Sequence, residues 1–276
     1  MTLMDERGPR WPAASALTPL LRVGANGATD EMRPLVNEVP IALVFNGTTV
    51  AVMMASPMHV DDFARGFALT EGYITGLGDI EAFDIVRHDS GIEARFWVAD
   101  AQADALTARR RAMLGPIGCG LCGIESLDQA LRPAARVGEG IRLCAADLPA
   151  AFDELRRHQS LHDETRSCHA AGFFVPGEPM RLCREDVGRH NALDKLIGAR
   201  LAEGQDGAGG VILMTSRLSV ELIQKASAFG CSVLAGVSGP SALAVSAAAQ
   251  ANLTLVGFCN AVAFDVFTCP ERIVLE

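Results

Sequence analysis

The last part of the chain alternates short apolar runs with longer segments of helical pattern, and this alternation limits the fold more than any other feature. The apolar runs are GGVILMT, CSVLAGVS and LTLVGF, and the segments between them are SRLSVELIQKASAFG and GPSALAVSAAAQAN. Short apolar runs are typical of strands that are buried on both faces. Parallel strands need a crossover connection, which a helix usually supplies. The sequence therefore predicts a β-α-β-α-β unit with a parallel sheet, and its fold class is α/β.

Upstream of this unit, the sequence indicates a smaller α+β domain. Two apolar runs flank Asn46 and Gly47, a dipeptide typical of hairpin turns. Ser56 and Pro57 suit the N-cap and the first position of a helix. The first 36 residues lack periodicity, and the stretch PAARVGEG is turn-like. We expect a mobile lead-in over residues 1–36, an N-terminal α+β domain over 37–140 and a C-terminal α/β domain over 141–276.

The charge balance and the absence of long apolar runs limit the partners. A formal net charge of −9 argues against a nucleic-acid or membrane-surface binder, which would carry a basic face. No secretory-type apolar region opens the sequence, and no run reaches about 18 apolar residues. We therefore expect a cytoplasmic protein whose eight cysteines form no structural disulfides. Six of them lie singly and, Cys168 aside, fit small buried hydrophobic residues.

Two strand-to-helix turns carry hydroxyl groups that could hold an anion. The first turn contains Ser216, Arg217 and Ser219, and the second contains Ser238 and Ser241. The N–H groups at a helix N-terminus attract phosphate, and an arginine adds bidentate geometry. Plain N-capping by the serines is the alternative interpretation. The pattern thus predicts either two caps or a phosphate or nucleotide site at the carboxyl edge of the sheet.

The segment CREDVGRHNALDKLIG places a dense group of charges before an amphipathic helix. The group includes Arg184, Asp186, Arg189 and His190 around Gly188. If Asp186 and His190 are both helical, they share a face and the carboxylate can orient the imidazole. A solvated charged face is the alternative. The pattern therefore leaves a pocket wall and an exposed surface open.

The segment TRSCHAAGFF predicts a strand that follows His169. A single histidine at such a place fits a structural residue as well as a ligand. Cys168 beside it could be a thiol with a lowered pKa, which depends on its neighbours in space.

The run GPIGCGLCGIESL holds a CxxC pair, Cys119 and Cys122, on a glycine-rich arm over residues 115–124. A structural zinc site needs about four ligands, so Cys168, His169 or His190 would have to complete it. A zinc deaminase places H-x-E before P-C-x-x-C, whereas HDE follows the cysteines here. A thioredoxin-type pair opens a helix, but glycines surround these thiols. A thiol that accepts and hands over a group needs such backbone freedom.

Taken in order, the segments CGLCGIESL, CHAAGFF, REDVGRHNALDKLIG, SRLSVELIQKASAFG, LAGVSGPSALAV and LTLVGF resemble the formate dehydrogenase accessory sulfurtransferase (FdhD-type) family. The resemblance covers about residues 36–276. It implies a cytoplasmic, dimeric sulfurtransferase that takes persulfide sulfur from a cysteine desulfurase. The sulfur would pass to the molybdenum (or tungsten) cofactor in its bis-molybdopterin guanine dinucleotide form, before formate dehydrogenase receives it. GDP would act as a ligand mimic.

The resemblance also assigns roles to residues. It implies that Cys119 carries the persulfide, with Cys122 as its partner, and that the C-terminal part is similar to cytidine deaminases. The family's cofactor-contacting stretch falls on Asn260, Ala261, Val262, Ala263, Phe264 and Asp265. Two departures occur: Arg166 and Ser167 replace the family's glycine pair, and NAVAFD lacks a basic residue. A zinc-stabilised nucleotide-binding chaperone without catalytic activity is the alternative function.

Overall fold

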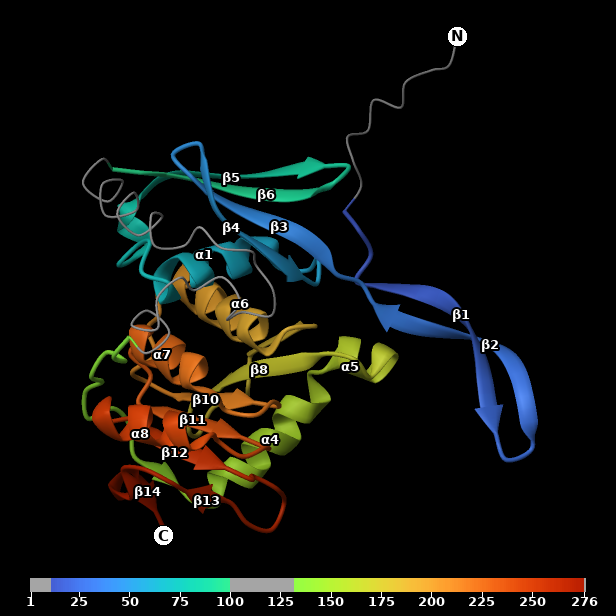
Figure 1. Cartoon of the computed structure of the whole chain (residues 1–276). Coiled ribbons are helices and arrows are strands. Elements are labelled where there is room, and N and C mark those ends of the chain that lie inside the picture. The colour runs from blue at the N-terminus through green and yellow to red at the C-terminus, as the bar shows by residue number, and fades with distance from the viewer. Residues whose placement is uncertain (1–10, 100–131, 276) are drawn as a thin grey trace.

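Two β-sheets, one from each half of the chain, enclose a pair of crossing helices (Figure 1). The computed structural model describes residues 11–99 and 132–275. In the first half, four strands form a sheet in the order β4-β3-β6-β5, and helix α1 covers it. The bounds are β3 Val39–Phe45, β4 Thr48–Ala55, α1 Val60–Thr70, β5 Ile80–His88 and β6 Gly91–Val98, with a 3-10 turn at Leu77–Asp79.

The second half contains a six-stranded sheet in the order β13-β12-β11-β10-β8-β9. Strands β10, β11 and β12 are parallel, and β8, β9 and β13 run antiparallel to their neighbours. The strands are β8 His169–Phe174, β9 Leu182–Asp186, β10 Val211–Met214, β11 Val233–Gly236, β12 Thr254–Gly257 and β13 Asp265–Val266. The helices are α4 Asp147–Arg157, α5 Ser160–Thr165, α6 Arg189–Ala202, α7 Val220–Ala228 and α8 Ala242–Gln250. The predicted β-α-β-α-β unit over β10 to β12 is confirmed within a larger mixed sheet.

Each face of the second sheet is covered by helices because its strand residues are apolar on both sides. Ile212, Leu234 and Leu255 pack against α6, α7 and α8. Val211 and Val233 pack with α4 on the opposite face. A short pair, β7 Leu143–Cys144 and β14 Ile273–Val274, lies beside α4, next to a 3-10 turn at Pro270–Arg272. This burial on both faces explains the continuous apolar runs in the sequence.

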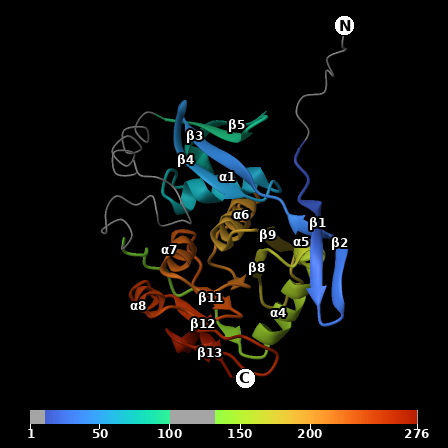
Figure 2. The same ribbon diagram turned by 45° about the vertical axis from the view of Figure 1, so that its right-hand side comes forward.

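The two halves meet where α1 crosses α6, and both views show this contact between the sheets (Figures 1 and 2). Glycines allow the close approach. A Cβ atom on Gly66 of α1 would lie 1.8 Å from the carbonyl oxygen of Asp194 in α6. A Cβ atom on Gly198 would lie 1.8 Å from the carbonyl oxygen of Asp62. The helix backbones therefore touch directly at this crossing.

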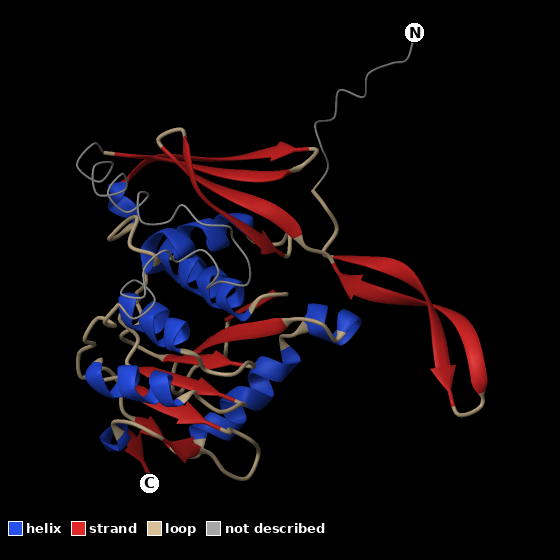
Figure 3. Cartoon of the chain, viewed as in Figure 1, coloured by secondary structure: helices blue, strands red, loops and turns tan. Residues whose placement is uncertain are grey.

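The N-terminal segment differs from the expected mobile lead-in. Strands β1 Ser15–Gly24 and β2 Gly27–Val36 form an antiparallel hairpin that projects from the body (Figures 1 and 3). Most of its side chains are exposed, including Leu21 and Val23. Backbone pairing rather than burial defines this ribbon, so the residues carry little of the burial pattern that reveals a core strand.

The predicted hairpin at Asn46 and Gly47 is confirmed, and both residues have positive φ angles of 45° and 77°. The predicted helix start at Ser56 and Pro57 is wrong. Helix α1 begins at Val60, and its N-cap residue is His59. Ser56 is instead fully buried and bound to Asp186, a residue 130 positions later in the chain.

Candidate functional site

The carboxyl ends of β10, β11 and β12 lie along one edge of the second sheet, and the two predicted turns meet there. The Leu218 N–H donates to the carbonyl of Gly239 at 3.2 Å. The Ser241 N–H donates to the carbonyl of Leu218 at 3.0 Å. The loop after β12 joins the same surface, because the Phe258 N–H donates to the carbonyl of Ser238 at 3.3 Å. Sequence reasoning therefore correctly grouped these segments at one sheet edge.

The serines of the two turns have different roles. The Ser241 hydroxyl caps α8, because it accepts a hydrogen bond from the Ala244 N–H at 3.2 Å. Ser219 occupies the N-cap of α7 without a capping side-chain bond, and its Oγ lies 3.4 Å from Nε2 of His190. Ser216 is buried and donates to the carbonyl of Arg217, whose own side chain is exposed. Capping therefore explains one of these serines, and in the first turn only Arg217 is exposed.

The stretch that the family resemblance marks as cofactor-contacting forms an exposed turn. Asn260 Oδ1 accepts hydrogen bonds from the N–H groups of Val262 and Ala263 at 2.9 and 3.0 Å. Val262 is 93% exposed at the tip. Phe264 turns back to pack against the core on the α4 side, and Asp265 begins β13 opposite Gly257. Asn260, Ala261, Val262 and Ala263 are all exposed, so they offer backbone groups and a small-residue surface to a ligand.

The expected pairing of Asp186 with His190 is wrong. Asp186 ends strand β9 and is fully buried, where it binds Lys195 Nζ at 2.6 Å. It also accepts hydrogen bonds from the backbone and hydroxyl of Ser56, both at 2.9 Å, and from Asn191 Nδ2 at 3.0 Å. The chain turns at Gly188 before α6 begins, so the two residues never share a helical face. Asp186 holds the two halves of the protein together.

Arg184 likewise serves the contact between the halves. Its Nε donates to Oδ2 of Asp62 in α1 at 2.8 Å, and both side chains are largely buried. Deeper in the same contact, Lys225 Nζ lies 2.9 Å from Asp194 Oδ2 and 2.9 Å from Glu71 Oε1. Arg184 and Asp186 are therefore structural residues in the described protein, which corrects their prediction as pocket residues.

His190 and Arg189 open helix α6 near the sheet edge. Nε2 of His190 lies 3.8 Å from Glu221 Oε2. The nearby imidazole of His190 is the main reason why the pKa of Glu221 falls to about 2, so this carboxylate stays charged. Arg189 has a buried Nε atom without a hydrogen-bond partner. Arg189 and His190 therefore remain at the candidate site, whereas Asp186 of the same charged segment lies in the contact between the two halves of the protein.

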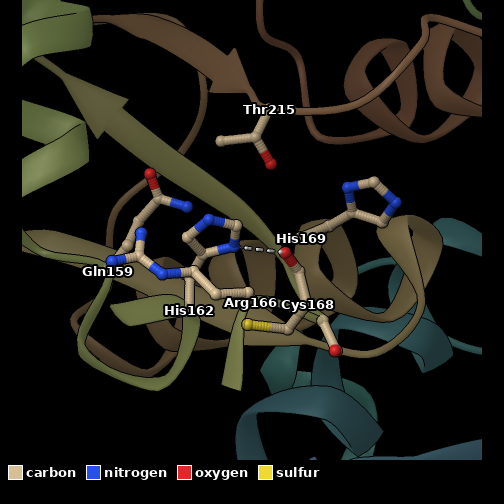
Figure 4. A pocket seen from close by; sticks show the side chains of 7 residues that line it. Gln159, His162, Arg166, Cys168, His169 and Thr215 are labelled. Atoms are coloured by element: carbon tan, nitrogen blue, oxygen red, sulfur yellow. Dashed lines mark hydrogen bonds between the residues drawn. The ribbon is translucent and has the colours of Figure 1, made fainter. Parts of the chain in front are cut away.

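A polar pocket of about 370 Å³ lies beside the end of β10 and the start of β8 (Figure 4). It is lined by Gln159, His162, Arg166, Ser167, Cys168, His169 and Thr215. The predicted strand after His169 is confirmed, because β8 begins at this residue. The Ala170 N–H donates to the Thr215 hydroxyl at 2.8 Å, which fixes β8 against the end of β10. Burial is the largest cause of the lowered pKa of His169, followed by the nearby Arg189.

Sequence reasoning missed Gln159, His162 and Thr215 as pocket residues. His162 opens the segment HDE, which the sequence analysis relates only to a deaminase motif. The side chain of His162 instead supports the pocket, where its Nδ1 donates to the carbonyl of Cys168 at 3.2 Å (Figure 4). Nothing local in the sequence shows that α5 and the end of β10 face each other across this cavity.

Cys168 does not have the lowered pKa that the sequence left open. Burial and the nearby Glu185 raise the pKa of its thiol to about 12. Burial also raises the pKa of Cys183 and Cys259 to about 12 and that of Cys231 to about 11. Such thiols are poor nucleophiles at neutral pH. All six cysteines of the described ranges are free thiols.

Cys119 and Cys122, the predicted carriers of sulfur, lie outside the described residues, as does the whole 115–124 arm. Within residues 11–99 and 132–275, no three His, Cys, Asp or Glu side chains are grouped in a way that could hold a metal ion. The same ranges contain no helix that is long and apolar enough to cross a membrane.

Comparison with known proteins decides between the families that a CxxC motif allows. Residues 36–274 match the FdhD/NarQ family. The chain belongs to the FdhD/NarQ family. The predicted family resemblance is therefore confirmed, and the family match spans both halves of the FdhD-type chain and the undescribed segment between them.

Relatives of this FdhD-type chain match it over most of its length. The sulfur carrier protein FdhD of Agrobacterium fabrum is 47% identical over 249 residues, which are 90% of this chain and 92% of the relative. Its namesake in Brucella abortus is 48% identical over 90% of this chain and 93% of the relative. The one in Bordetella bronchiseptica is 42% identical over 95% of this chain and 96% of the relative.

A solved structure supports the fold of this FdhD-type chain. It is the crystal structure of a protein described as a candidate formate dehydrogenase accessory protein, from Desulfotalea psychrophila. The two share a TM-score of 0.76 at 22% identity, over 95% of this chain and all of the other. The mixed α/β fold is thereby shown, whereas the expected likeness to cytidine deaminases stays a prediction.

Proposed function

We propose that this protein is a sulfurtransferase that carries persulfide sulfur from a cysteine desulfurase to the molybdenum cofactor. The acceptor is the bis-molybdopterin guanine dinucleotide form, and formate dehydrogenase receives it afterwards. Membership of the FdhD/NarQ family, with relatives named sulfur carrier proteins that match over nine-tenths of the chain, is the observation that carries the proposal. The site of action is cytoplasmic, and the working form is a homodimer.

Sulfur transfer requires a thiolate, and most cysteines of the described ranges hold their proton at neutral pH. Four of the six have pKa values raised to about 11 or 12, mainly by burial. These values favour a role for Cys119 and Cys122, which stand among three glycines in the sequence. A carrier thiol must visit a donor and an acceptor, and glycine provides the required backbone freedom.

Each transfer step conserves atoms and electrons. The Cys119 thiolate attacks the outer sulfur of the desulfurase persulfide, and the desulfurase cysteine leaves as a thiolate. Cys119 then holds the sulfur as a persulfide. Attack of the Cys122 thiolate on the inner sulfur releases hydrosulfide to the cofactor and leaves a Cys119–Cys122 disulfide, which a cellular dithiol must reduce.

The sheet edge is the proposed place of the acceptor. The exposed turn from Asn260 to Ala263, the first turn with its exposed Arg217, and the polar pocket at His169 lie along it. Helix N-termini at this edge suit the phosphates of a guanine dinucleotide, so GDP should bind as a partial substrate.

Intact-mass spectrometry tests the carrier role. The full-length protein is incubated with a cysteine desulfurase and cysteine, then compared with Cys119→Ala, Cys122→Ala and the matched control Cys269→Ala. We expect one added sulfur in the wild type and in Cys269→Ala, and none in Cys119→Ala. Full loading of Cys119→Ala would overturn the proposal. Stoichiometric zinc that stabilises an unloaded protein would instead favour the nucleotide-binding chaperone.

A further inference from the structure

We propose that the ribbon formed by β1 and β2 is an exchange arm whose apolar face packs on a second copy of this chain. Apart from its last residue, the ribbon lies ahead of the family match over residues 36–274, so the sulfur chemistry of the family does not account for it. The inference deepens the homodimer of the proposed function, because it names the surface that joins two copies. The receiving surface is the outer face of the first sheet, opposite α1.

The two faces of the ribbon differ in polarity. Successive side chains of a strand point to opposite faces, so the register of β1 with β2 sorts the residues between them. One face carries two prolines, one acid and the apolar side chains of Leu17, Leu21, Val23 and Met32. The opposite face carries both arginines of the ribbon, and Arg22 pairs there with Glu31 at 3.5 Å. The ribbon is therefore amphipathic.

The apolar face is uncovered in the described protein. Between 57% and 74% of the surface of its four large apolar residues is exposed. The base of the ribbon rests near α5, where the Ser15 hydroxyl donates to Glu164, and the rest projects from the body (Figure 1). A two-stranded hairpin is at best marginally stable in water when it packs on nothing. An apolar face of this kind marks an interaction surface.

The outer edges of the ribbon are unsuited to the addition of another strand. The Asn37 N–H donates to the carbonyl of Ala14 at 2.8 Å, so the even-numbered residues of β1 make the hydrogen-bonded pairs of the ladder. The odd-numbered residues would direct their N–H groups outward, and Pro19 has none to offer. Pro34, which faces Leu17, interrupts the outer edge of β2 in the same way. The ribbon therefore binds through its face.

The size and the charge of the face favour a second copy as its occupant. Strands of ten residues that lie about 4.8 Å apart give a face of about 33 by 10 Å. One such contact is small, but reciprocal exchange buries two arms and two receiving surfaces, about 1,300 Å² in all, and a stable interface needs about 1,200 Å² or more. The ribbon contains two arginines and two acids, so it adds no net charge between chains that each carry −9.

The outer face of the first sheet is the matching surface. Helix α1 covers the inner face, and Figures 1 and 2 show no described helix over the outer one. Val52, Met54 and Trp97 alternate with inward-facing residues and are 39% to 48% exposed on this outer face. Two sheet faces pack about 10 Å apart when their side chains interdigitate. Both apolar faces are thus covered by one reciprocal contact.

A hollow on the ribbon gives this contact a centre. It has a volume of about 420 Å³, and its lining includes Leu21, Asp30 and Met32. Trp97 is the largest exposed side chain of the receiving face, and tryptophan is enriched among the residues that dominate binding energy. Arg95 lies on the same face two residues earlier and offers a cation to Asp30, the one charge on the apolar side of the ribbon.

Sedimentation velocity of the full-length protein over a range of concentrations tests the arm. We expect a wild-type dimer whose dissociation constant rises about tenfold or more in Leu17→Asp and in Met54→Asp, because each variant places a charge in an apolar contact. The matched control Thr29→Asp adds the same charge on the opposite face of the ribbon, beside Arg22, and should dimerise like the wild type. A monomeric wild type, or either apolar-face variant dimerising like the control, would overturn the proposal.

A second measurement does not depend on how well those variants fold. The chain has two tryptophans, so in Trp11→Phe the fluorescence reports on Trp97 alone. Its emission should move to shorter wavelengths as the concentration rises through the range of dimerisation, and an unchanged emission would contradict the arm. Sulfur loading of Cys119 is measured separately and should persist in Leu17→Asp. Loss of loading with an intact dimer would overturn the proposal and assign the ribbon to the desulfurase.

Discussion

Replacing Gly66 by alanine places a methyl group inside the helix crossing that joins the two halves. The added Cβ atom would lie 1.8 Å from the carbonyl oxygen of Asp194 and 2.9 Å from the backbone nitrogen of Gly198. Both neighbours are helix backbone, so neither can rotate away as a side chain would. The helices must separate by about 1.6 Å to restore an ordinary contact of 3.4 Å.

The magnitude follows from two opposing effects. Forced overpacking costs about 1–3 kcal/mol or more, and rigid backbone on both sides puts this site at the upper end. Alanine gains about 1 kcal/mol over glycine inside a helix. Separation of α1 from α6 also lengthens the hydrogen bond from the Thr70 hydroxyl to Asp194, which is 2.7 Å long. We expect Gly66→Ala to lower the free energy of unfolding by at least about 2 kcal/mol.

Urea denaturation followed by circular dichroism measures this loss. Gly78→Ala is the matched control, because nothing lies within 4 Å of its new Cβ atom. Gly198→Ala repeats the perturbation from the other helix, where the new atom would lie 1.8 Å from the carbonyl of Asp62. A loss below about 1 kcal/mol in Gly66→Ala would refute the direct backbone contact.

Two further predictions concern buried charge and pH. Burial opposes the charge on Lys225, but Asp194 and Glu71 raise its pKa overall, so Lys225→Met leaves a buried carboxylate unpaired and should cost about 3–5 kcal/mol in urea denaturation. The double variant Lys225→Met/Asp194→Leu should recover much of this stability, and a double variant as unstable as the single one would contradict the account. Burial lowers the pKa of His59 and His169 below 6.5, so the unfolded chain binds protons more readily. The contribution of the two neutral histidines to the stability of the folded protein is full above pH 6.5 and falls as the pH drops below that value. The melting temperature should therefore decline below pH 6.5, and it should decline less steeply in the double variant His59→Gln/His169→Gln. A melting temperature that does not change with pH down to pH 5 would be inconsistent with this prediction.

Local patterns in the sequence predicted those elements whose stability is local or periodic. The β-α-β-α-β unit was predicted because its strands are buried on both faces and its helices follow each strand directly. The hairpin at Asn46 was predicted because the turn requires positive φ angles. The hairpin β1–β2 was missed, since an exposed ribbon shows little of the burial pattern on which such predictions depend.

Contacts between residues that are far apart in the chain could not be predicted from local sequence patterns. Ser56 was interpreted as an N-cap, whereas its partner Asp186 comes 130 residues later. Asp194 and Lys195 sit in a segment that looks amphipathic, but α6 is buried between α1 and the second sheet, and both charges are enclosed. The fold therefore separates the charged residues of the segment CREDVGRHNALDKLIG. Asp186 joins the two halves of the protein, whereas Arg189 and His190 lie near the edge of the second sheet.

The candidate site shows the same division. The two serine turns and the stretch from Asn260 were placed at one edge because parallel strands bring their carboxyl ends together. The pocket at His169 also needs His162 from α5, and this juxtaposition depends on the antiparallel strand β8. No periodic pattern in the sequence predicts that β8 runs antiparallel to β10.

The central claim is that Cys119 carries sulfur, and one measurement tests it most directly. Wild type and Cys119→Ala are each incubated with a cysteine desulfurase and cysteine, and their intact masses are recorded before and after treatment with a dithiol. The account predicts one added sulfur atom on the wild type, removed by the dithiol, and none on Cys119→Ala. Equal, reversible sulfur loading of both proteins would contradict it.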